Sequence, residues 1–357
     1  MGKRFDLLEM FSRQLIVREV GVNGQLRLLE SRVAVIGCGA TGTATVELLV
    51  RAGIGYVRII DRDIVELSNI SRSHLHTVED AMEAKPKALS CAEKLMKINP
   101  YARIDYVVSE VNPRNIEDLV KDVDIIVDGT DNMMTRYLIN DASLKLSKPW
   151  VMQGASTWYG QVILIRPRVT ACLRCLMPEP PPEVGNACSI LGTMNTTISL
   201  ITSISANEVI KHILGLSSGG ELIYVDALRN QVTKFRLVRN PSCPACSQNK
   251  LEFITSQEFI RVKRVCGSHA VQVYPEKPVN INTCNVQGLS TQSPCVKVVL
   301  TTPYLLKALV EDYEVVLFND GRAIINGLTD GELAMRIYNE LMKNLFTTNS
   351  KATHCGL

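Results

Sequence analysis

Val33-Ala34-Val35-Ile36-Gly37-Cys38-Gly39-Ala40-Thr41-Gly42 is a short apolar run that passes directly into a glycine-rich turn. Residues 43–52 behind it are compatible with a helix, so the stretch predicts a strand, a tight turn and a helix in succession. Only glycine allows the close backbone approach that a polyphosphate needs at a helix N-terminus. Asp61 ends the next apolar run about twenty residues further on, where it can accept hydrogen bonds from ribose hydroxyls. We therefore expect a nucleotide site; the alternative is a turn that is tight for packing reasons alone.

The segments that follow continue the same alternation. Strands are expected at 33–36, 56–60, 104–108 and 124–128, and helices at 43–52, 87–98 and 116–119. This pattern is typical of a doubly wound, mostly parallel α/β sheet of the Rossmann-like kind, which binds ligands beyond the carboxyl ends of its strands. After Trp150 the pattern changes, and we expect the sheet to continue as a mixed sheet. Its strands are expected at 162–165, 222–225 and 233–238, with an apolar helix at 198–214.

A second, smaller α+β domain is expected towards the C-terminus. The apolar runs 314–318 and 323–325 flank the turn Asn319-Asp320-Gly321-Arg322, which predicts a hairpin, and residues 332–345 are compatible with a helix. We expect domains at 1–254 and 255–347, with a loose polar tail at 348–357.

Composition excludes several classes of function. The 357 residues carry a formal net charge of +3 and no block of lysine and arginine, which argues against nucleic acid as a partner. The apolar segment 198–214 contains Glu208, Lys211 and His212, so it reads as a buried helix rather than a membrane span. Eleven cysteines without an N-terminal apolar stretch favour a reducing compartment, and we expect a cytoplasmic protein.

Polar residues beyond the glycine turn indicate which nucleotide would bind. Arg72 and Lys87 supply two cations for phosphates, and Asp131 supplies a carboxylate for magnesium, which suits ATP better than NAD. The alternative is that the two cations are ordinary surface charges and that Asp128 and Asp131 cap the following helix.

Two cysteine couplets, Cys172-x-x-Cys175 and Cys243-x-x-Cys246, predict a closed structural zinc site of four thiolates that joins two distant segments. A thioredoxin-like redox pair is the alternative, but it needs only one couplet.

Cys188 lies between the couplets, before the apolar helix 198–214, where a helix dipole could stabilise its thiolate. The alternative for Cys188 is a small buried residue. The remaining cysteines are interpreted as packing residues: Cys38, Cys91, Cys266, Cys284, Cys295 and Cys355.

Several short motifs occur in a characteristic order along most of residues 6–250. They are Ser12-Arg13-Gln14, the 37–42 turn, Asp61-Arg62-Asp63, Leu67-Ser68-Asn69-Ile70-Ser71-Arg72, Lys85-Pro86-Lys87, Asp128-Gly129-Thr130-Asp131-Asn132 and both couplets. With them the chain resembles the ubiquitin-activating enzyme superfamily, including the ThiF-like and molybdopterin-synthase adenylyltransferases. Ala40 departs from the pattern, since relatives often carry glycine there. The spacing between Arg72 and Lys87 is also a little longer than in bacterial relatives.

The resemblance implies that a carrier protein's C-terminal glycine carboxylate attacks the α-phosphorus of ATP, with magnesium bound and pyrophosphate released. It implies a homodimer, because Arg13 reaches the partner's site in this superfamily. It assigns the nucleotide to Gly37, Gly39, Ala40, Gly42, Asp61, Asp63, Asn69, Arg72, Lys87, Asp131 and Asn132. It assigns catalytic roles to Arg13, Lys87, Asp131 and Cys188, and zinc to Cys172, Cys175, Cys243 and Cys246.

Two functions share this first half-reaction. The favoured reading is activation of a ubiquitin-like β-grasp protein, with a thioester on Cys188 and transfer to a conjugating enzyme. The alternative is activation of a sulfur carrier for molybdopterin, thiamine or tRNA thiolation. The first is favoured because residues from about 257 resemble an accessory domain of some archaeal members and no rhodanese-like segment is present. A nicotinamide-dependent oxidoreductase and an inactive carrier-binding adaptor remain as further alternatives.

Overall fold

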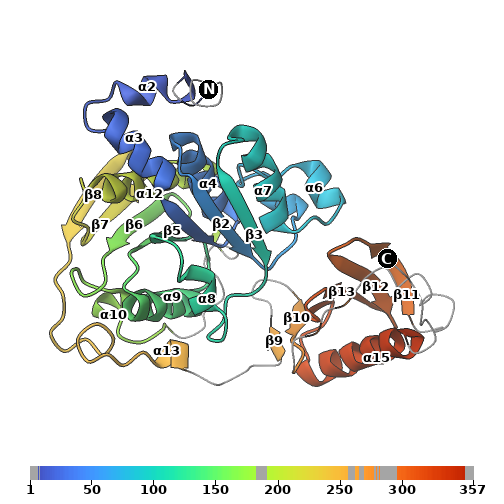
Figure 1. Cartoon of the computed structure of the whole chain (residues 1–357). Coiled ribbons are helices and arrows are strands. Elements are labelled where there is room, and N and C mark those ends of the chain that lie inside the picture. Colours follow the sequence, from blue (N-terminus) through green and yellow to red (C-terminus); the bar gives the residue numbers. More distant parts are fainter. Residues whose placement is uncertain are drawn as a thin grey trace. The chain divides into compact units, whose positions relative to one another are not determined.

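The computed structural model describes residues 7, 9–181, 191–255, 262–264, 269–276, 279, 281 and 296–349. The chain divides into two compact units, Met1–Gln257 and Glu258–Leu357, which are shown in Figure 1 and described separately below.

The first unit is built on an eight-stranded sheet with the order β3-β2-β1-β4-β5-β6-β7-β8. Its strands are β1 (Arg32–Ile36), β2 (Tyr56–Asp61), β3 (Arg103–Val108), β4 (Ile125–Asp128), β5 (Trp150–Ser156), β6 (Tyr159–Ile165), β7 (Glu221–Asp226) and β8 (Gln231–Arg236). The strands from β3 to β5 in this order are parallel, and β6, β7 and β8 continue the sheet antiparallel. The predicted fold class, a mostly parallel sheet that continues as a mixed one, is confirmed.

Helices cover both faces of this sheet (Figure 1). The helices of the unit are α2 (Ser12–Leu15), α3 (Gly21–Glu30), α4 (Ala40–Ala52), α5 (Leu67–Ile70), α6 (Val78–Met82), α7 (Lys87–Ile98), α8 (Ile116–Val120), α9 (Met133–Leu146), α10 (Leu173–Leu176), α12 (Asn195–Leu214) and α13 (Glu252–Thr255). Residues of α4, α7 and α12 share one hydrophobic cluster, and residues of α8, α9 and α10 share another.

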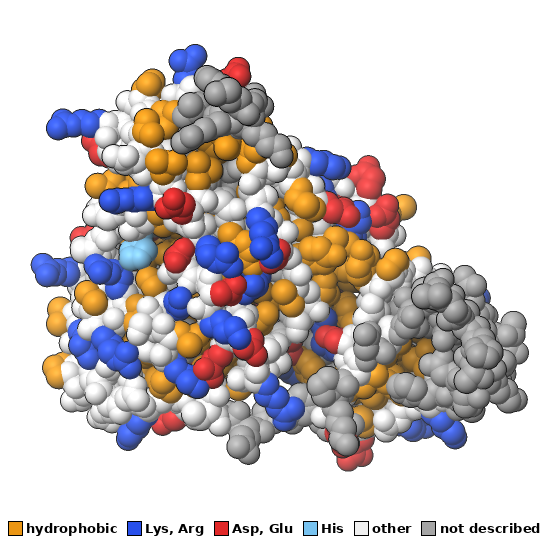
Figure 2. All heavy atoms as spheres, viewed as in Figure 1, with side chains coloured by type: hydrophobic (Ala, Val, Ile, Leu, Met, Phe, Trp, Pro, Cys, Tyr) orange, Lys and Arg blue, Asp and Glu red, His pale blue; other side chains and the backbone are white. Residues whose placement is uncertain are grey.

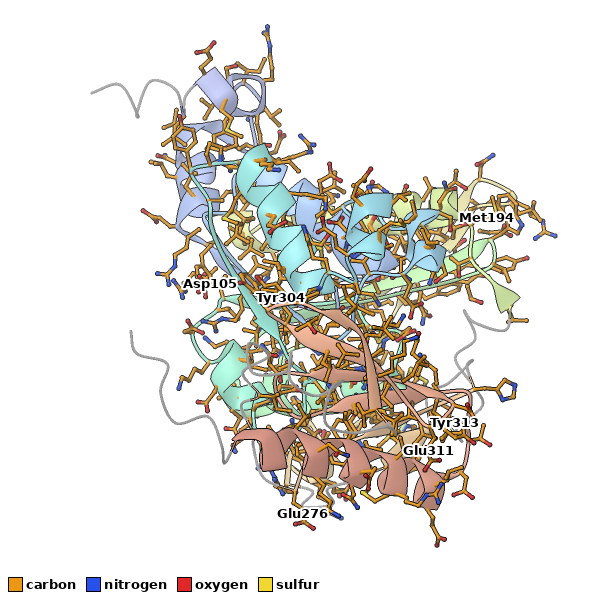
Figure 3. All side chains as sticks on the ribbon, turned by 90° about the vertical axis from the view of Figure 1, so that its right-hand side faces the viewer. Asp105, Met194, Glu276, Tyr304, Glu311 and Tyr313 are labelled. Atoms are coloured by element: carbon orange, nitrogen blue, oxygen red, sulfur yellow. A yellow bond between two sulfur atoms is a disulfide. The ribbon has the colours of Figure 1, made fainter. Side chains whose placement is uncertain are left out.

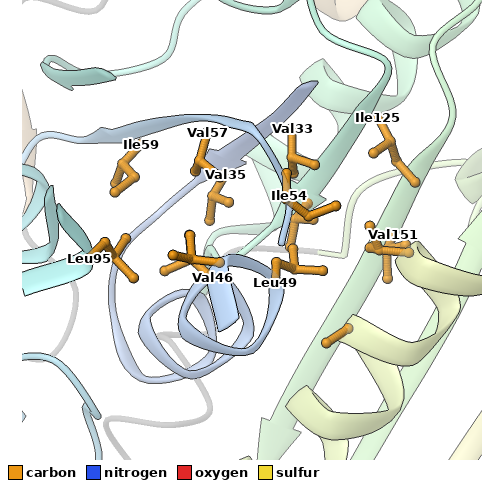
Figure 4. Close-up of a cluster of buried hydrophobic side chains, with 14 of the residues drawn as sticks. Val33, Val35, Val46, Leu49, Ile54, Val57, Ile59, Leu95, Ile125 and Val151 are labelled. Atoms are coloured by element: carbon orange, nitrogen blue, oxygen red, sulfur yellow. The ribbon is translucent and has the colours of Figure 1, made fainter. Parts of the chain in front are cut away.

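Alternation along β1 explains why two cores form. Val33 and Val35 face the cluster that contains α4 and α7, whereas Ala34 and Ile36 face the cluster on the other side. Both faces of the strand are therefore buried, as expected for a central parallel strand. Figure 4 shows the first cluster, in which Val46 and Leu49 of α4 lie against the β1 and β2 side chains.

Glycines end two of the helices that pack on this sheet. Gly53 follows α4 with φ +96°, and Gly215 follows α12 with φ +77°, so both adopt the left-handed conformation that favours glycine at a helix C-terminus. The first of these ends fixes where the chain turns back into β2. Because β1 and β2 pair in parallel, their carboxyl ends lie side by side.

The order β2-β1-β4 places a topological switch point between β1 and β4. The chain leaves β1 towards β2 on one side, while β4 pairs with the other side of β1 in parallel, for example Val33 with Ile125. The connections that follow these two strands therefore leave in opposite directions, and doubly wound sheets bind their ligands at such a point, beyond the carboxyl ends of the strands. The predicted glycine turn and the Asp128–Asn132 run both lie at this point.

The second unit is an antiparallel sheet with one long helix. Its strand order is β11-β12-β13-β14-β10-β9. The elements are β9 (Val262–Arg264), β10 (Ala270–Val273), β11 (Val296–Thr301), β12 (Leu305–Val310), β13 (Tyr313–Phe318), β14 (Ala323–Asn326) and α15 (Gly331–Asn349). The predicted hairpin is confirmed, since Val315 of β13 pairs with Ile325 of β14. Glu311 and Tyr313 mark the β12–β13 turn, and α15 packs along one side of the sheet (Figure 3).

The surface agrees with the modest net charge. On the face drawn in Figure 2, basic and acidic side chains are interspersed rather than gathered by sign. Among the described residues, no helix has both the length and the apolar character that crossing a bilayer would require.

Candidate nucleotide site and four-cysteine cluster

Two turns meet in backbone contact at the switch point. A Cβ added to Gly37 would lie 2.7 Å from the carbonyl carbon of Gly129, and one added to Gly129 would lie 2.2 Å from the Gly37 oxygen. A Cβ on Gly42 would lie 2.0 Å from the same oxygen. Each distance is far below van der Waals contact, so only glycine fits at all three positions. The turn after β1 and the turn after β4 thus form one continuous backbone surface.

The start of α4, next to this contact, has free space around it. Gly39 precedes the helix, and a Cβ there would meet no atom within 4 Å. Ala40, the first residue of α4, keeps its backbone amide. The first amides of a helix have no partner within the helix and carry partial positive charge. This end of α4 can therefore receive an anionic group such as a phosphate.

The turn after β1, the start of α4 and the turn after β4 together are called the cradle below. Asp61, at the end of β2, connects the turn after β1 to the turn after β2. Its carboxylate accepts hydrogen bonds from the Cys38 amide (2.6 Å) and from the Asp63 amide (2.7 Å). The side chain is nearly buried, and burial raises the pKa of Asp61 although Lys87 opposes the shift. Because each carboxylate oxygen has more than one acceptor site, Asp61 retains capacity for a ribose hydroxyl.

Lys87 begins α7 beside this carboxylate. Its Nζ lies 3.4 Å from Asp63 Oδ2, and its amide donates to the Asp63 carbonyl (2.8 Å). Burial alone would lower the pKa of Lys87, but the carboxylates of Asp63, Asp61 and Glu66 raise it overall. The ammonium group therefore stays charged and is held at the carboxyl end of β2. Sequence analysis predicted Asp61, Asp63 and Lys87, and the structure brings the three together.

The short helix α5 places two further predicted residues. Asn69 is buried and closes a capping box, accepting from the Glu66 amide (3.0 Å). Arg72 donates to the Ser68 carbonyl (2.6 Å) of the same turn. Both side chains are thus fixed by their own local structure.

The turn after β4 carries Asp131 and Asn132. Asn132 caps α9, since its side chain accepts from the Thr135 amide (3.1 Å). Asp131 is exposed on the same turn, two residues beyond the Gly129 contact with Gly37. A carboxylate in that place is an oxygen ligand of the type magnesium prefers.

Sequence analysis missed the residue that holds this turn in place. Arg136 of α9 is buried and donates to Asp128 Oδ2 (2.7 Å), to the Thr130 carbonyl (2.8 Å) and to the Gln153 carbonyl (2.7 Å). Asp128 is fully buried, so this ion pair lies out of water. An arginine one turn inside a helix that follows an acidic strand end is the signal that could have indicated the pair.

Replacing Arg136 with methionine should lower the free energy of unfolding by about 3–5 kcal/mol, because Asp128 would be left buried and unpaired. It should also weaken the binding of a nucleotide at the switch point through the displaced turn. Chemical denaturation and nucleotide titration measure the two effects. The matched control is Arg51→Met, which removes an exposed pair with Glu47 and should cost under about 1 kcal/mol. Equal stability of the two variants would contradict the positioning role.

Two predicted residues lie apart from this cluster. Arg13 is exposed on α2, among the N-terminal helices rather than at the switch point. Cys188 falls within 182–190, outside the described residues. Their proposed roles therefore stay predictions.

Two cysteines, Cys38 and Cys91, differ from their predicted role as packing residues. Cys38 forms a disulfide with Cys91 of α7. Next to them, His76 contacts the Cys38 carbonyl through Nε2 (2.9 Å) and Ser90 Oγ through Nδ1 (3.0 Å). Burial lowers the pKa of His76 to about 4, so the imidazole is neutral near pH 7.

The two couplets converge into a four-cysteine cluster. The Sγ atoms of Cys172 and Cys175 are 3.9 Å apart, those of Cys172 and Cys243 3.6 Å, and those of Cys175 and Cys246 3.5 Å. A tetrahedral zinc with bonds of about 2.3 Å to sulfur requires sulfur atoms roughly 3.8 Å apart. The cluster therefore fits zinc without rearrangement. The hydrogen bond between the two sulfur atoms lowers the pKa of Cys175 and raises that of Cys172, so the cluster holds four thiolates together only when a cation compensates them.

Neighbouring polar contacts fix the cluster to α9 and to the later loop. The Leu173 amide donates to Asn140 Oδ1 (2.9 Å), which attaches the first couplet to α9. Arg239 donates to the Cys246 carbonyl (2.8 Å). Arg174, fully buried, reaches Glu252 (2.8 Å) and the Pro178 carbonyl (3.0 Å). The cluster thus lies within the fold rather than on a separate finger.

Comparisons with known proteins agree with this geometry. The ThiF family profile matches residues 11–245. The sulfur carrier protein ThiS adenylyltransferase of Bacillus subtilis is 32% identical over 332 residues, covering 92% of this chain and 98% of its own length. The sulfur carrier protein adenylyltransferase of Thermus thermophilus is 34% identical, covering 73% of this chain and 97% of its own. Adenylyltransferase and sulfurtransferase MOCS3 of Sus scrofa is 34% identical, and the chain spans 58% of that protein's length.

Solved structures share the fold at lower identity. A crystal structure of Escherichia coli MccB with MccA-N7isoASN has a TM-score of 0.59 and 22% identity, covering 67% of this chain and 74% of that one. A crystal structure of MccB with ATP has a TM-score of 0.55 and 22% identity, covering 63% and 69%.

Proposed function

The chain belongs to the ThiF family, and from that premise we propose that it adenylates the C-terminal carboxylate of a β-grasp sulfur-carrier protein with ATP. The observation that carries the proposal is the backbone surface at the β1–β4 switch point, flanked by the paired Lys87 and the exposed Asp131. Such a site suits an anionic polyphosphate and a divalent cation together.

In the proposed reaction a carboxylate oxygen of the carrier attacks the α-phosphorus of ATP. The bond from that phosphorus to the bridging oxygen breaks, and pyrophosphate leaves with the electron pair. The chain's contribution is positioning and charge neutralisation. The amides at the start of α4 would hold phosphate oxygens, Asp61 the ribose, and Asn69, Arg72 and Lys87 the remaining phosphate charge. Magnesium held at Asp131 would supply further positive charge.

The relatives support a sulfur carrier more than a ubiquitin-like modifier, which reverses the preference drawn from the sequence. The Bacillus match covers 92% of the chain, whereas the first unit ends at Gln257, so the match extends into the second unit. The second unit therefore does not distinguish a modifier-activating enzyme from a sulfur-carrier adenylyltransferase. Transfer to a conjugating enzyme has no comparable support.

Three finer assignments belong to the same proposal. Cys188 would accept the activated acyl group by thiolate attack on its carbonyl carbon, releasing AMP. Arg13 would act in the site of a second copy, which makes a homodimer the expected assembly. The four-cysteine cluster would hold zinc as a structural ion, since four thiolates leave no open coordination position.

The proposal is tested with β-grasp candidates that end in Gly-Gly, incubated with enzyme, ATP and magnesium. We expect carrier-dependent exchange of labelled pyrophosphate into ATP. With a persulfide donor protein and a thiol reductant, which cleaves the resulting acyl disulfide and is itself oxidised, we expect a carrier thiocarboxylate, seen by intact mass. Cys188→Ala should keep the exchange and lose the thiol-labile adduct of carrier and enzyme. Exchange absent with every carrier would refute the function; an adduct that persists in Cys188→Ala would move the nucleophile elsewhere.

A further inference from the structure

One peptide group of the glycine turn, between Cys38 and Gly39, faces two different environments. The Cys38 carbonyl lies 2.9 Å from Nε2 of His76, and His76 is nearly buried. The peptide is trans, so its carbonyl and its amide point in opposite directions. The Gly39 amide therefore points away from His76 and from the buried side of the turn.

This amide is open to a ligand. Within the part of the chain that the structure describes, no group accepts a hydrogen bond from it. Gly39 is half-buried, and a Cβ there would meet no atom within 4 Å. Because Gly39 directly precedes α4, its amide adds one donor to those that the start of the helix offers to an anion.

The backbone alone does not fix the direction of this peptide. A flip of the peptide changes ψ of Cys38 and φ of Gly39, which is −85° in the structure, and glycine also accepts the positive φ that a flip would produce. The disulfide with Cys91 holds the Cys38 side chain, but it leaves the rotation of the following peptide free. A flipped peptide would present a carbonyl oxygen to a phosphate in place of an amide.

We propose that His76 is a positioning residue for ATP, because its Nε2–H holds the Cys38 carbonyl on the buried side and so directs the Gly39 amide at a phosphate group. This inference rests on the proposed function, since it concerns the same nucleotide. His76 acts through the peptide and not by contact with the ligand.

The surroundings of the imidazole place its proton on Nε2. A carbonyl oxygen can only accept, so the ring nitrogen that faces Cys38 must be the donor. Burial lowers the pKa of His76 to about 4, so near pH 7 the ring carries one proton and Nδ1 must accept. Ser90 Oγ lies 3.0 Å from Nδ1 and can donate to it. Lys94 donates to both Ser90 Oγ (3.0 Å) and Asp80, so each group of this buried network has a partner.

His76 is held in place independently of its contact with Cys38. Two residues before it, the His74 amide donates to Thr43 Oγ1 (3.1 Å) of α4. Directly after it, Thr77 is the N-cap of α6 and closes a capping box. The segment is thus anchored on either side of His76. The imidazole can therefore impose a direction on the Cys38–Gly39 peptide and need not follow it.

Two substitutions separate the two ends of the imidazole. The side-chain nitrogen of glutamine can occupy the place of Nε2, so His76→Gln keeps a donor for the Cys38 carbonyl. Asparagine reaches only as far as Nδ1, so His76→Asn keeps a partner for Ser90 and loses that donor. The test measures the Kd of ATP and of adenosine for the full-length proteins. Adenosine has no phosphate and reports on the rest of the nucleotide site.

His76→Asn should bind ATP roughly tenfold more weakly than the parent protein, the scale of one hydrogen bond to a charged phosphate, and should bind adenosine equally well. His76→Gln should restore the ATP affinity. Ser90→Ala is the matched control, because it removes a fully buried partner of Nδ1 and leaves Nε2 in place. It should lower stability, seen by chemical denaturation, without weakening ATP.

Three results would each overturn this inference alone: undiminished ATP affinity in His76→Asn, an equal loss of ATP and adenosine affinity in that variant, or a His76→Gln variant that binds ATP as weakly as His76→Asn. A loss of ATP affinity in Ser90→Ala as large as in His76→Asn would also count against it, since stability would then explain both. A parent protein that binds no ATP would overturn the proposed function, and this inference with it.

Discussion

Asp131→Asn is expected to lower ATP–pyrophosphate exchange by roughly a hundredfold to a thousandfold, the range for losing one electrostatic partner of a reacting group. The substitution keeps the size of the side chain and removes the charge that would hold magnesium beside the cradle. Because Asp131 is exposed, the free energy of unfolding should stay within about 0.5 kcal/mol of the parent protein. Exchange is measured with labelled pyrophosphate at saturating carrier, and stability by chemical denaturation.

The control for this prediction is Asp118→Asn on α8. Asp118 is also an exposed acid and pairs with Lys121 (2.7 Å). It lies outside the described cradle, so its loss should leave exchange unchanged. Normal exchange in Asp131→Asn would remove this residue from the magnesium site, whereas a drop in both variants would point to a general effect of charge.

Cys243→Ser should release the metal and lower the free energy of unfolding by about 3–5 kcal/mol, because the remaining buried thiolates lose the cation that compensates them. Cys243 has no exposed surface and lies 3.6 Å from Cys172, so the cluster cannot close around an ion without it. Elemental analysis should give about one zinc per chain for the parent protein and none for the variant. Unfolding is followed by chemical denaturation.

Ser242→Ala provides the comparison, since it changes the exposed residue next to Cys243 and leaves all four sulfur atoms in place. Its zinc content and stability should match those of the parent. A parent protein that folds normally and contains no zinc would refute the four-thiolate assignment. Full zinc content in Cys243→Ser would show that the ion binds elsewhere.

Secondary structure could be predicted from the sequence where one short continuous stretch carries all the residues that determine it. The run from β1 through the glycine turn into α4 was predictable because an apolar strand, glycines and a helix follow each other directly. The helix at 87–98 was predicted with the same bounds as α7. By contrast, β5 was not predicted, and the helix after Asp131 that became α9 was anticipated without bounds. The core-facing side of α9 includes Arg136, Asn140 and Asp141, and these buried polar residues obscure the apolar periodicity on which a prediction depends.

Contacts between segments that are far apart in the sequence could not be predicted from short sequence patterns. Gly37 meets Gly129 across more than ninety positions, and nothing in either turn alone indicates that meeting. The pairing of Cys38 with Cys91 is of the same kind, because two isolated cysteines carry no spacing signal. The cysteine couplets were the exception. A repeated Cys-x-x-Cys pattern indicates that the two couplets bind one metal ion, even when they lie far apart in the sequence.

The meeting of Gly37, Gly42 and Gly129 also limits how this site can diversify. Since no side chain fits at those positions, substitutions there cannot create new nucleotide preferences. New preferences would have to arise at neighbouring positions, where Asp61 and Lys87 present side chains and Gly39 has open space. An engineer seeking another nucleotide should therefore vary these neighbouring positions and keep the three glycines.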